Sequence, residues 1–109
     1  MPLEQIDNAT LKTLLDSEPE LQVVDVRDEA EWLATGLLPK TIKIPIHELP
    51  YAYRMVDPDR PAVVVCAHGA RSLNAAYFLE AQGYTRLYNL EHGLAEWDGE
   101  LEPYSKQGV

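Results

Sequence analysis

The feature of the sequence that most restricts its fold is a continuous apolar run that is soon followed by a helical pattern. Residues Ala62–Cys66 read AVVVC, an uninterrupted apolar run that is typical of a strand buried on both faces. A helical stretch begins near Leu73 and extends to about Gln82, where Gly83 can end it. Strands buried on both faces belong to parallel sheets covered by helices, so this segment predicts an α/β fold.

Three other segments resemble the strand at 62–66. Residues 21–26, 41–44 and 86–90 are short and rich in Val, Ile, Leu or Tyr, which favours strands. Helical patterns separate them along the chain. This order predicts a parallel sheet with helices on both faces, and ligands of such sheets bind beyond the carboxyl ends of the strands.

Capping and turn residues mark where the helices begin and end. Asp7 or Asn8 can cap a first helix, and Asp28 can cap a second, short helix that ends at Gly36. A further helical pattern is interrupted by Pro50, which removes a backbone donor.

The length of 109 residues predicts a single domain over 1–109, with a core of about 5–100 and a loose C-terminal tail at 101–109. No apolar run approaches the roughly 20 residues of a membrane span, and the N-terminus lacks the pattern of a signal peptide. Cys66 is the only cysteine, so no internal disulfide can form. These features favour a reducing, cytoplasmic compartment.

The charge is strongly negative but unevenly distributed. Nine Lys and Arg against 18 Asp and Glu give a formal net charge of −9, which disfavours nucleic acid and anionic membranes as partners. No Asp or Glu occurs between Arg60 and Leu79, and this gap contains Cys66, His68 and Arg71. The sequence therefore predicts a locally neutral to positive environment around the cysteine.

The loop from Cys66 to Ser72 has the composition expected of an anion site. A thiol at the end of a strand and above a helix N-terminus meets backbone N–H groups and the helix dipole, which favour the thiolate. We therefore predict that Cys66 is a nucleophile. We predict that the other loop residues form the cradle that binds the anionic substrate. They are Ala67, His68, Gly69, Ala70, Arg71 and Ser72.

The cradle residues differ in what they can contribute. Ala67, Gly69 and Ala70 are small and allow the backbone to curl tightly. Arg71 can hold an anionic donor or stabilise the thiolate. Ser72 can cap the following helix and also donate to sulfur. His68 either lines the mouth of the site or is a polar loop residue.

Four blocks, in order, resemble those of the single-domain rhodanese-like sulfurtransferases. Each block alone is a weak signal, and the order of all four over residues 5–100 is more specific. They are Val24-Asp25-Val26-Arg27 with Glu31, Gly36 to Pro45, the loop Cys66 to Ser72, and Leu90 to Trp97.

The resemblance implies a fold, an activity and a site. The fold would be a rhodanese-like parallel sheet of about five strands with helices on both faces. The activity would move a sulfane sulfur from a small anionic donor such as thiosulfate to a thiol or cyanide acceptor, or to a protein acceptor, through a persulfide on Cys66. No metal and no organic cofactor would be required.

The sequence departs from the family pattern at several positions. Leu37 replaces a usual His, Lys40-Thr41 replaces Gly-Ala, and His92 replaces the first closing Gly. Many members carry a basic residue directly after the cysteine, where this chain has Ala67. Arg71 is consequently the only fixed positive charge of the loop.

Other functions remain open at this point. A sulfur-carrier or protein-docking module would use the same fold without turning over free thiosulfate. A small Cys-based phosphatase or arsenate reductase is disfavoured, because phosphatases use C-x5-R whereas Cys66 to Arg71 is C-x4-R, a smaller ring. Asp25 and Arg27 are interpreted as structural, with Arg27 expected to form an ion pair with Glu31.

Overall fold

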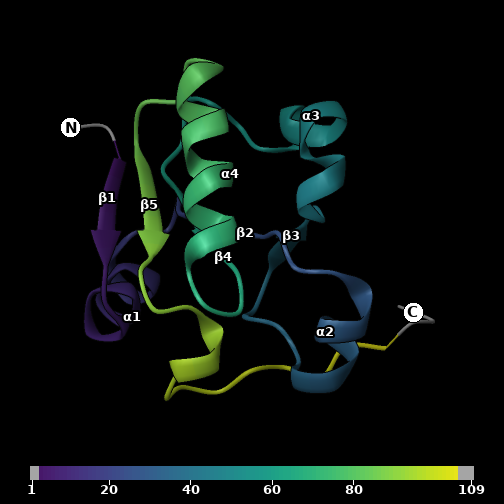
Figure 1. Cartoon of the computed structure of the whole chain (residues 1–109). Coiled ribbons are helices and arrows are strands. Elements are labelled where there is room, and N and C mark those ends of the chain that lie inside the picture. Colours follow the sequence, from purple (N-terminus) through teal and green to yellow (C-terminus); the bar gives the residue numbers. More distant parts are fainter. Residues whose placement is uncertain (1–2, 106–109) are drawn as a thin grey trace.

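The computed structural model describes residues 3–105 and contains a five-stranded, entirely parallel sheet. The strand order is β1-β5-β4-β2-β3, with β4 in the centre (Figure 1). The predicted α/β fold with about five parallel strands is confirmed. The strands are β1 (Leu3–Ile6), β2 (Gln22–Asp25), β3 (Thr41–Lys43), β4 (Ala62–Val65) and β5 (Leu87–Leu90).

Helices cover both faces of the sheet, as predicted. The α-helices are α1 (Asn8–Ser17), α2 (Glu29–Thr35), α3 (Leu49–Ala52) and α4 (Ala70–Ala81), and the 3-10 turns are η1 (Ile46–Glu48), η2 (Tyr53–Met55) and η3 (Leu94–Glu96). Val64 of β4 packs with residues of α4 and α3, whereas Val63 and Val65 pack on the other face with residues of α1 and η3. This alternation follows from the period of two along a strand, and it explains why β4 is apolar at every position.

The first strand, β1, was not among the segments predicted from the sequence. Only Ile6 of its four residues is buried, because β1 lies at the edge of the sheet. Its pairing with β5 places Gln5 beside Asn89 and Ile6 beside Leu90. Tertiary pairing, rather than a local apolar pattern, makes this segment a strand.

The predicted helix boundaries are confirmed at α1 and α2. The Asp7 side chain accepts a hydrogen bond from the Thr10 N–H, and Asp28 forms a reciprocal capping box with Glu31. Gly36 ends α2 with φ +86°. Pro50 does not break a helix, because it lies in the first turn of α3, where a missing N–H costs no hydrogen bond.

The expectation of a loose tail is wrong for residues 101–105. Leu37 and Glu102 exchange two backbone hydrogen bonds, of 2.9 and 2.6 Å, in an antiparallel bridge. Tyr104 packs edge-on against Trp32 and donates a hydrogen bond to the Glu29 carboxylate. Residues 106–109 of the expected tail lie outside the described residues.

Within residues 3–105, no helix has both the length and the apolar character that a membrane crossing requires. In the same range, no group of three or more His, Cys, Asp and Glu side chains has an arrangement suited to a metal ion.

Candidate active site

Cys66 lies directly after β4, at the carboxyl edge of the central strand. The loop from Cys66 to α4 is at the lower edge of the sheet in Figure 1, the edge toward which the strands point. Only 1% of the Cys66 surface is exposed. The thiol is therefore at the base of the loop rather than on the protein surface.

Three hydrogen-bonding groups converge on the Cys66 sulfur. The backbone N–H groups of Gly69 and Ser72 donate to Sγ at 3.1 and 3.3 Å, and the Ser72 hydroxyl lies 3.2 Å from it. Burial raises the pKa of the Cys66 thiol, but hydrogen bonds with the Ser72 hydroxyl and with backbone N–H groups of the loop outweigh it, so the pKa lies below its ordinary value. The buried sulfur is consequently suited to carry negative charge.

The loop keeps its shape because two glycines allow close backbone approach. Gly69 has φ +98°, and a Cβ on it would collide with the backbone carbonyl of Glu91. Gly93 has φ +77°, and a Cβ on it would collide with the backbone of Ala67. The N–H of Leu94 donates to the Cys66 carbonyl at 2.8 Å. The segment after β5 thus supports the cysteine loop from one side.

The loop residues predicted from the sequence occupy different depths. Gly69 and Ser72 are buried beside the sulfur, whereas His68 and Ala70 are exposed and Ala67 and Arg71 are partly buried. Ser72 does not cap α4. The helix begins earlier, with Gly69 as the N-cap residue, and the Ser72 side chain lies within the first turn, where it contacts Cys66 instead.

The guanidinium of Arg71 is paired with Glu31 of α2. Its Nη1 and Nη2 donate to the two carboxylate oxygens at 2.8 and 2.7 Å. The hydrogen bonds from Arg71 lower the pKa of Glu31 to about 2. The stretch between Arg60 and Leu79 lacks acidic residues in the sequence, but the folded protein still has a carboxylate next to the loop. Glu31 of α2 binds Arg71, the only arginine of the loop.

The expected ion pair of Arg27 with Glu31 is wrong. Arg27 instead binds Asp25, with Nη2 to Oδ2 at 2.8 Å and Nε near both carboxylate oxygens. Its remaining donors bind the Thr35 hydroxyl and the Gly36 carbonyl at 2.7 and 2.8 Å. Both charged residues are almost fully buried, so Arg27 joins the end of β2 to the end of α2.

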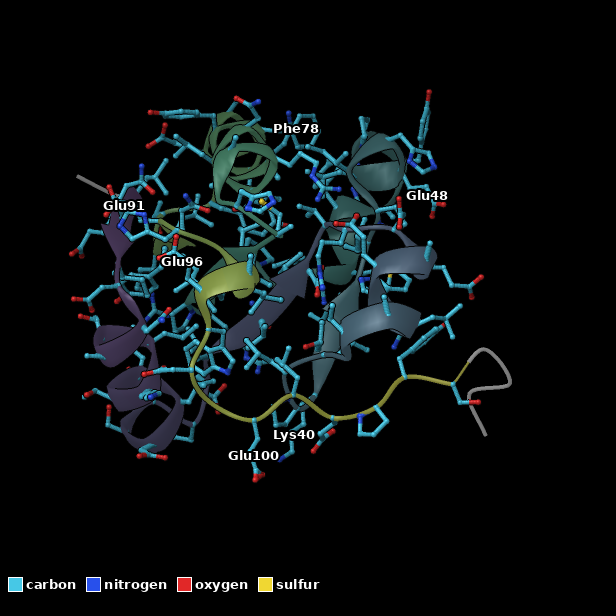
Figure 2. All side chains as sticks on the ribbon, turned by 60° about the horizontal axis from the view of Figure 1, so that its bottom comes forward. Lys40, Glu48, Phe78, Glu91, Glu96 and Glu100 are labelled. Atoms are coloured by element: carbon cyan, nitrogen blue, oxygen red, sulfur yellow. The ribbon has the colours of Figure 1, made fainter. Side chains whose placement is uncertain are left out.

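A small hollow lies beside the loop. It has a volume of about 150 Å³ and is lined by Arg27, Glu31, Ala34, Thr35, Ala67, Leu94 and Ala95. In Figure 2, which turns this edge toward the viewer, Glu91 and Glu96 are on one side of the edge and Glu48 is on the other. None of these three carboxylates lines the hollow, where Glu31 is the one acidic residue.

Sequence reasoning did not identify Asn89 as part of the site. The Ser72 hydroxyl donates to Asn89 Oδ1, and Asn89 is completely buried on β5. One signal was available, since Asn89 is the only polar side chain other than a tyrosine in the strand LYNL. An amide in a buried strand needs hydrogen-bond partners, and here the partners belong to the cysteine loop.

The chain resembles known proteins over most of its length. Residues 7–100 match the family model described as the rhodanese-like domain. A sulfurtransferase of Allochromatium vinosum is 35% identical over 95 residues, which cover 87% of this chain and 88% of the relative. The thiosulfate sulfurtransferase GlpE of Shewanella oneidensis is 36% identical over 77 residues, 71% of this chain and 75% of the relative.

The fold matches solved structures of the same kind. A rhodanese-like domain protein from Staphylococcus aureus superimposes with a TM-score of 0.83 at 32% identity, over 94% of this chain and 99% of that chain. On the sequence match over 7–100 and on this structural agreement, the chain belongs to the rhodanese-like domain family.

Proposed function

We propose that this protein is a sulfurtransferase that moves a sulfane sulfur from a donor such as thiosulfate to a thiol or cyanide acceptor through a persulfide on Cys66. The observation that carries the proposal is the convergence of the Gly69 N–H, the Ser72 N–H and the Ser72 hydroxyl on the Cys66 sulfur. The names of the two relatives, a sulfurtransferase and a thiosulfate sulfurtransferase, support the same reaction class.

In the first step, the Cys66 thiolate attacks the outer sulfur of thiosulfate. A sulfur–sulfur bond forms to Cys66, the sulfur–sulfur bond of thiosulfate breaks, and sulfite leaves with the electron pair. The charge is conserved, since a thiolate and a dianion become a persulfide anion and sulfite dianion. Loop N–H groups that point toward the sulfur stabilise negative charge in both the resting and the loaded enzyme.

In the second step, an acceptor thiolate attacks the outer sulfur of the persulfide. The acceptor becomes a persulfide anion, and Cys66 leaves as the thiolate that began the cycle. Cyanide as acceptor gives thiocyanate by the same displacement. No oxidant, metal or organic cofactor enters either step.

Arg71 is proposed to bind the anionic donor by exchanging its partner. The Arg71 side chain is 39% exposed, and its guanidinium holds Glu31 with two hydrogen bonds that an oxyanion of the donor can replace. His68 and Ala70, which are exposed on the same loop, would contact the donor or acceptor at the mouth, and the small side chain of Ala67 would keep the adjacent hollow open.

The alternatives differ in what happens after the persulfide forms. A sulfur-carrier or docking module would accept sulfur and release it only to one protein partner, without multiple turnovers of free thiosulfate. A Cys-based phosphatase or arsenate reductase would form no persulfide from thiosulfate.

Because the chemistry requires a reduced thiol, we propose that the protein acts in the cytoplasm. We propose no nucleic acid and no membrane as partner.

Intact-mass spectrometry tests the proposal directly. After reduction and desalting, incubation with thiosulfate should add one sulfur atom, about 32 Da, and release one equivalent of sulfite. Adding cyanide should remove the adduct and form thiocyanate through many cycles. Cys66→Ser should show neither event while keeping its circular dichroism spectrum. The absence of an adduct on the reduced, folded protein would contradict the proposal, and a single turnover only would favour the carrier.

A further inference from the structure

The Ser72 hydroxyl lies near more hydrogen-bond acceptors than its one hydrogen can bind. The oxygen lies 3.2 Å from Cys66 Sγ, 3.2 Å from the Gly69 carbonyl oxygen and 2.5 Å from Asn89 Oδ1. A hydroxyl has one hydrogen to donate, and the two carbonyl oxygens can only accept. When Cys66 is a thiolate, the sulfur becomes a third acceptor. The direction of one O–H bond therefore decides whether the hydroxyl stabilises the thiolate.

The orientation of the Asn89 amide is determined by its other neighbours. Its Nδ2 donates to the Gly69 carbonyl at 3.2 Å and to Gln5 Oε1 at 2.6 Å. A flipped amide would place Oδ1 against the Gly69 carbonyl, two acceptors without a hydrogen between them. Asn89 Oδ1 consequently faces Ser72 and attracts its hydroxyl hydrogen.

The position of Asn89 is otherwise that of a core residue. It is fully buried on the face of β5 that also carries Leu87, which packs under α4. Burying an amide is unfavourable unless its hydrogen bonds are satisfied, so an apolar side chain would be the simpler choice for packing. Both polar atoms of Asn89 are directed to the cysteine loop and to the adjacent strand instead.

We propose that Asn89 is a positioning residue for sulfur transfer: its carboxamide directs the Ser72 hydroxyl away from Cys66 in the resting thiol and thereby limits how much of Cys66 is the reactive thiolate. In the thiol state, the Cys66 S–H donates to Ser72 Oγ and the Ser72 O–H donates to Asn89 Oδ1. When the thiol loses its proton to solvent, the hydroxyl turns and donates to the sulfur, leaving Asn89 Oδ1 without that hydrogen bond.

This inference rests on the proposed role of Cys66 as the nucleophile, but its test does not require sulfur transfer. The other charged or titratable groups on the segments around Cys66 remain the same in every variant described below. They include Asp25 at the end of β2, Arg27 just after it, Glu31 on α2, His68 on the loop, Arg71 on α4, and Glu91 and His92 after β5.

The test is the pH dependence of Cys66 alkylation by iodoacetamide, which reports the thiolate fraction. Asn89→Leu keeps the shape of the side chain and removes both polar atoms, so the Ser72 hydroxyl is free to donate to sulfur. We expect the apparent pKa of Cys66 to fall by about half a unit to one unit, equivalent to about 3- to 10-fold more thiolate below the pKa. Asn74→Leu, the same change at an exposed position of α4, should leave the pKa unchanged.

The Ser72→Ala background separates positioning from general disturbance of the loop. If Asn89 acts through the Ser72 hydroxyl, Asn89→Leu should not change the pKa further once Ser72 is Ala. A loosened loop would lose N–H donors and raise the pKa of Cys66. An unchanged or raised pKa in Asn89→Leu, or an equal fall in the Ser72→Ala background, would overturn the inference.

A measurement on the unmodified protein covers the case in which Asn89→Leu does not fold. The side-chain amide NMR signals of Asn89 should titrate with the same pKa as Cys66, and this change should become much smaller in Ser72→Ala. Signals that do not follow the Cys66 titration would contradict the inference. A protein that passes these tests but forms no persulfide with thiosulfate would overturn the proposed function and leave the positioning role of Asn89 intact.

Discussion

Two arginine–carboxylate pairs lie at the carboxyl edge of the sheet, and they differ in burial and in sequence separation. Arg27 and Asp25 are 3% and 0% exposed and two residues apart, whereas Arg71 and Glu31 are 39% and 29% exposed and 40 residues apart. In both pairs the guanidinium binds both carboxylate oxygens, with three side-chain hydrogen bonds of 2.8–3.1 Å from Arg27 and two of 2.7 and 2.8 Å from Arg71. The chemistry of the contact is the same, so burial separates their roles.

Burial determines whether such a pair can exchange partners. Arg27 has hydrogen bonds to Asp25, Thr35 and Gly36, and no solvent can replace them, so separating the pair would leave buried charge unpaired. Arg71 is partly in water, where a pair contributes little stability and an incoming anion can replace the carboxylate. The buried pair is therefore suited to hold α2 in place, whereas the exposed Arg71 remains able to take the proposed role of binding an anionic donor.

Loss of Arg27 should have the largest effect on stability. Arg27→Ala leaves the Asp25 carboxylate buried and unpaired, so we expect the free energy of unfolding to fall by about 3–5 kcal/mol in urea titrations. Lys12→Ala breaks the exposed Lys12–Asp98 pair and should change it by less than about 1 kcal/mol. Equal effects of the two substitutions would remove the distinction between buried and exposed pairs.

Loss of Arg71 should affect catalysis instead of stability. In Arg71→Ala we expect kcat/KM for thiosulfate to fall by about 10- to 100-fold, because a charge-assisted contact with the donor is lost. The urea midpoint should stay close to that of the unmodified protein. Steady-state thiocyanate formation measures the first quantity. An unchanged kcat/KM would show that Arg71 does not bind the donor.

Removing the competing carboxylate of Glu31 should improve thiosulfate binding, whereas removing Arg71 weakens it. Glu31→Gln leaves Arg71 charged but without its ionic partner, so thiosulfate no longer displaces a carboxylate. We expect KM for thiosulfate to fall about 2- to 5-fold, consistent with the loss of one exposed ion pair. If KM rises, Glu31 acts by holding Arg71 in position for the donor rather than by competing with it.

The smallest expected effect is the dependence of stability on acid. The pKa of Glu31 is lowered from 4.5 to about 2, so its contribution is fully present above about pH 4.5 and is lost as the pH falls toward 2. The free energy of unfolding, from urea titrations at pH 5 and pH 2.5, should change less with pH in Glu31→Gln than in the unmodified protein. The two proteins should differ in this change by less than about 1 kcal/mol, because the Arg71–Glu31 pair is partly exposed. Identical pH slopes would contradict the pairing with Arg71.

Much of the architecture was predictable from local patterns. The apolar run at 62–66, the caps Asp7 and Asp28, and the stop at Gly36 involve interactions within a few residues, so the sequence alone reveals them. The edge strand β1 was missed because its short, mostly exposed pattern becomes a strand only by pairing with β5.

The sequence by itself determined the parallel α/β fold and placed its only cysteine after the central strand, because strand periodicity and small loop residues act locally. Only the tertiary structure decided the partners of the site: Glu31 rather than a substrate on Arg71, Asp25 on Arg27, and Asn89 behind Ser72. Ion pairs and buried hydrogen bonds depend on which side chains the folded chain brings within about 3 Å, a distance that sequence separation does not reveal.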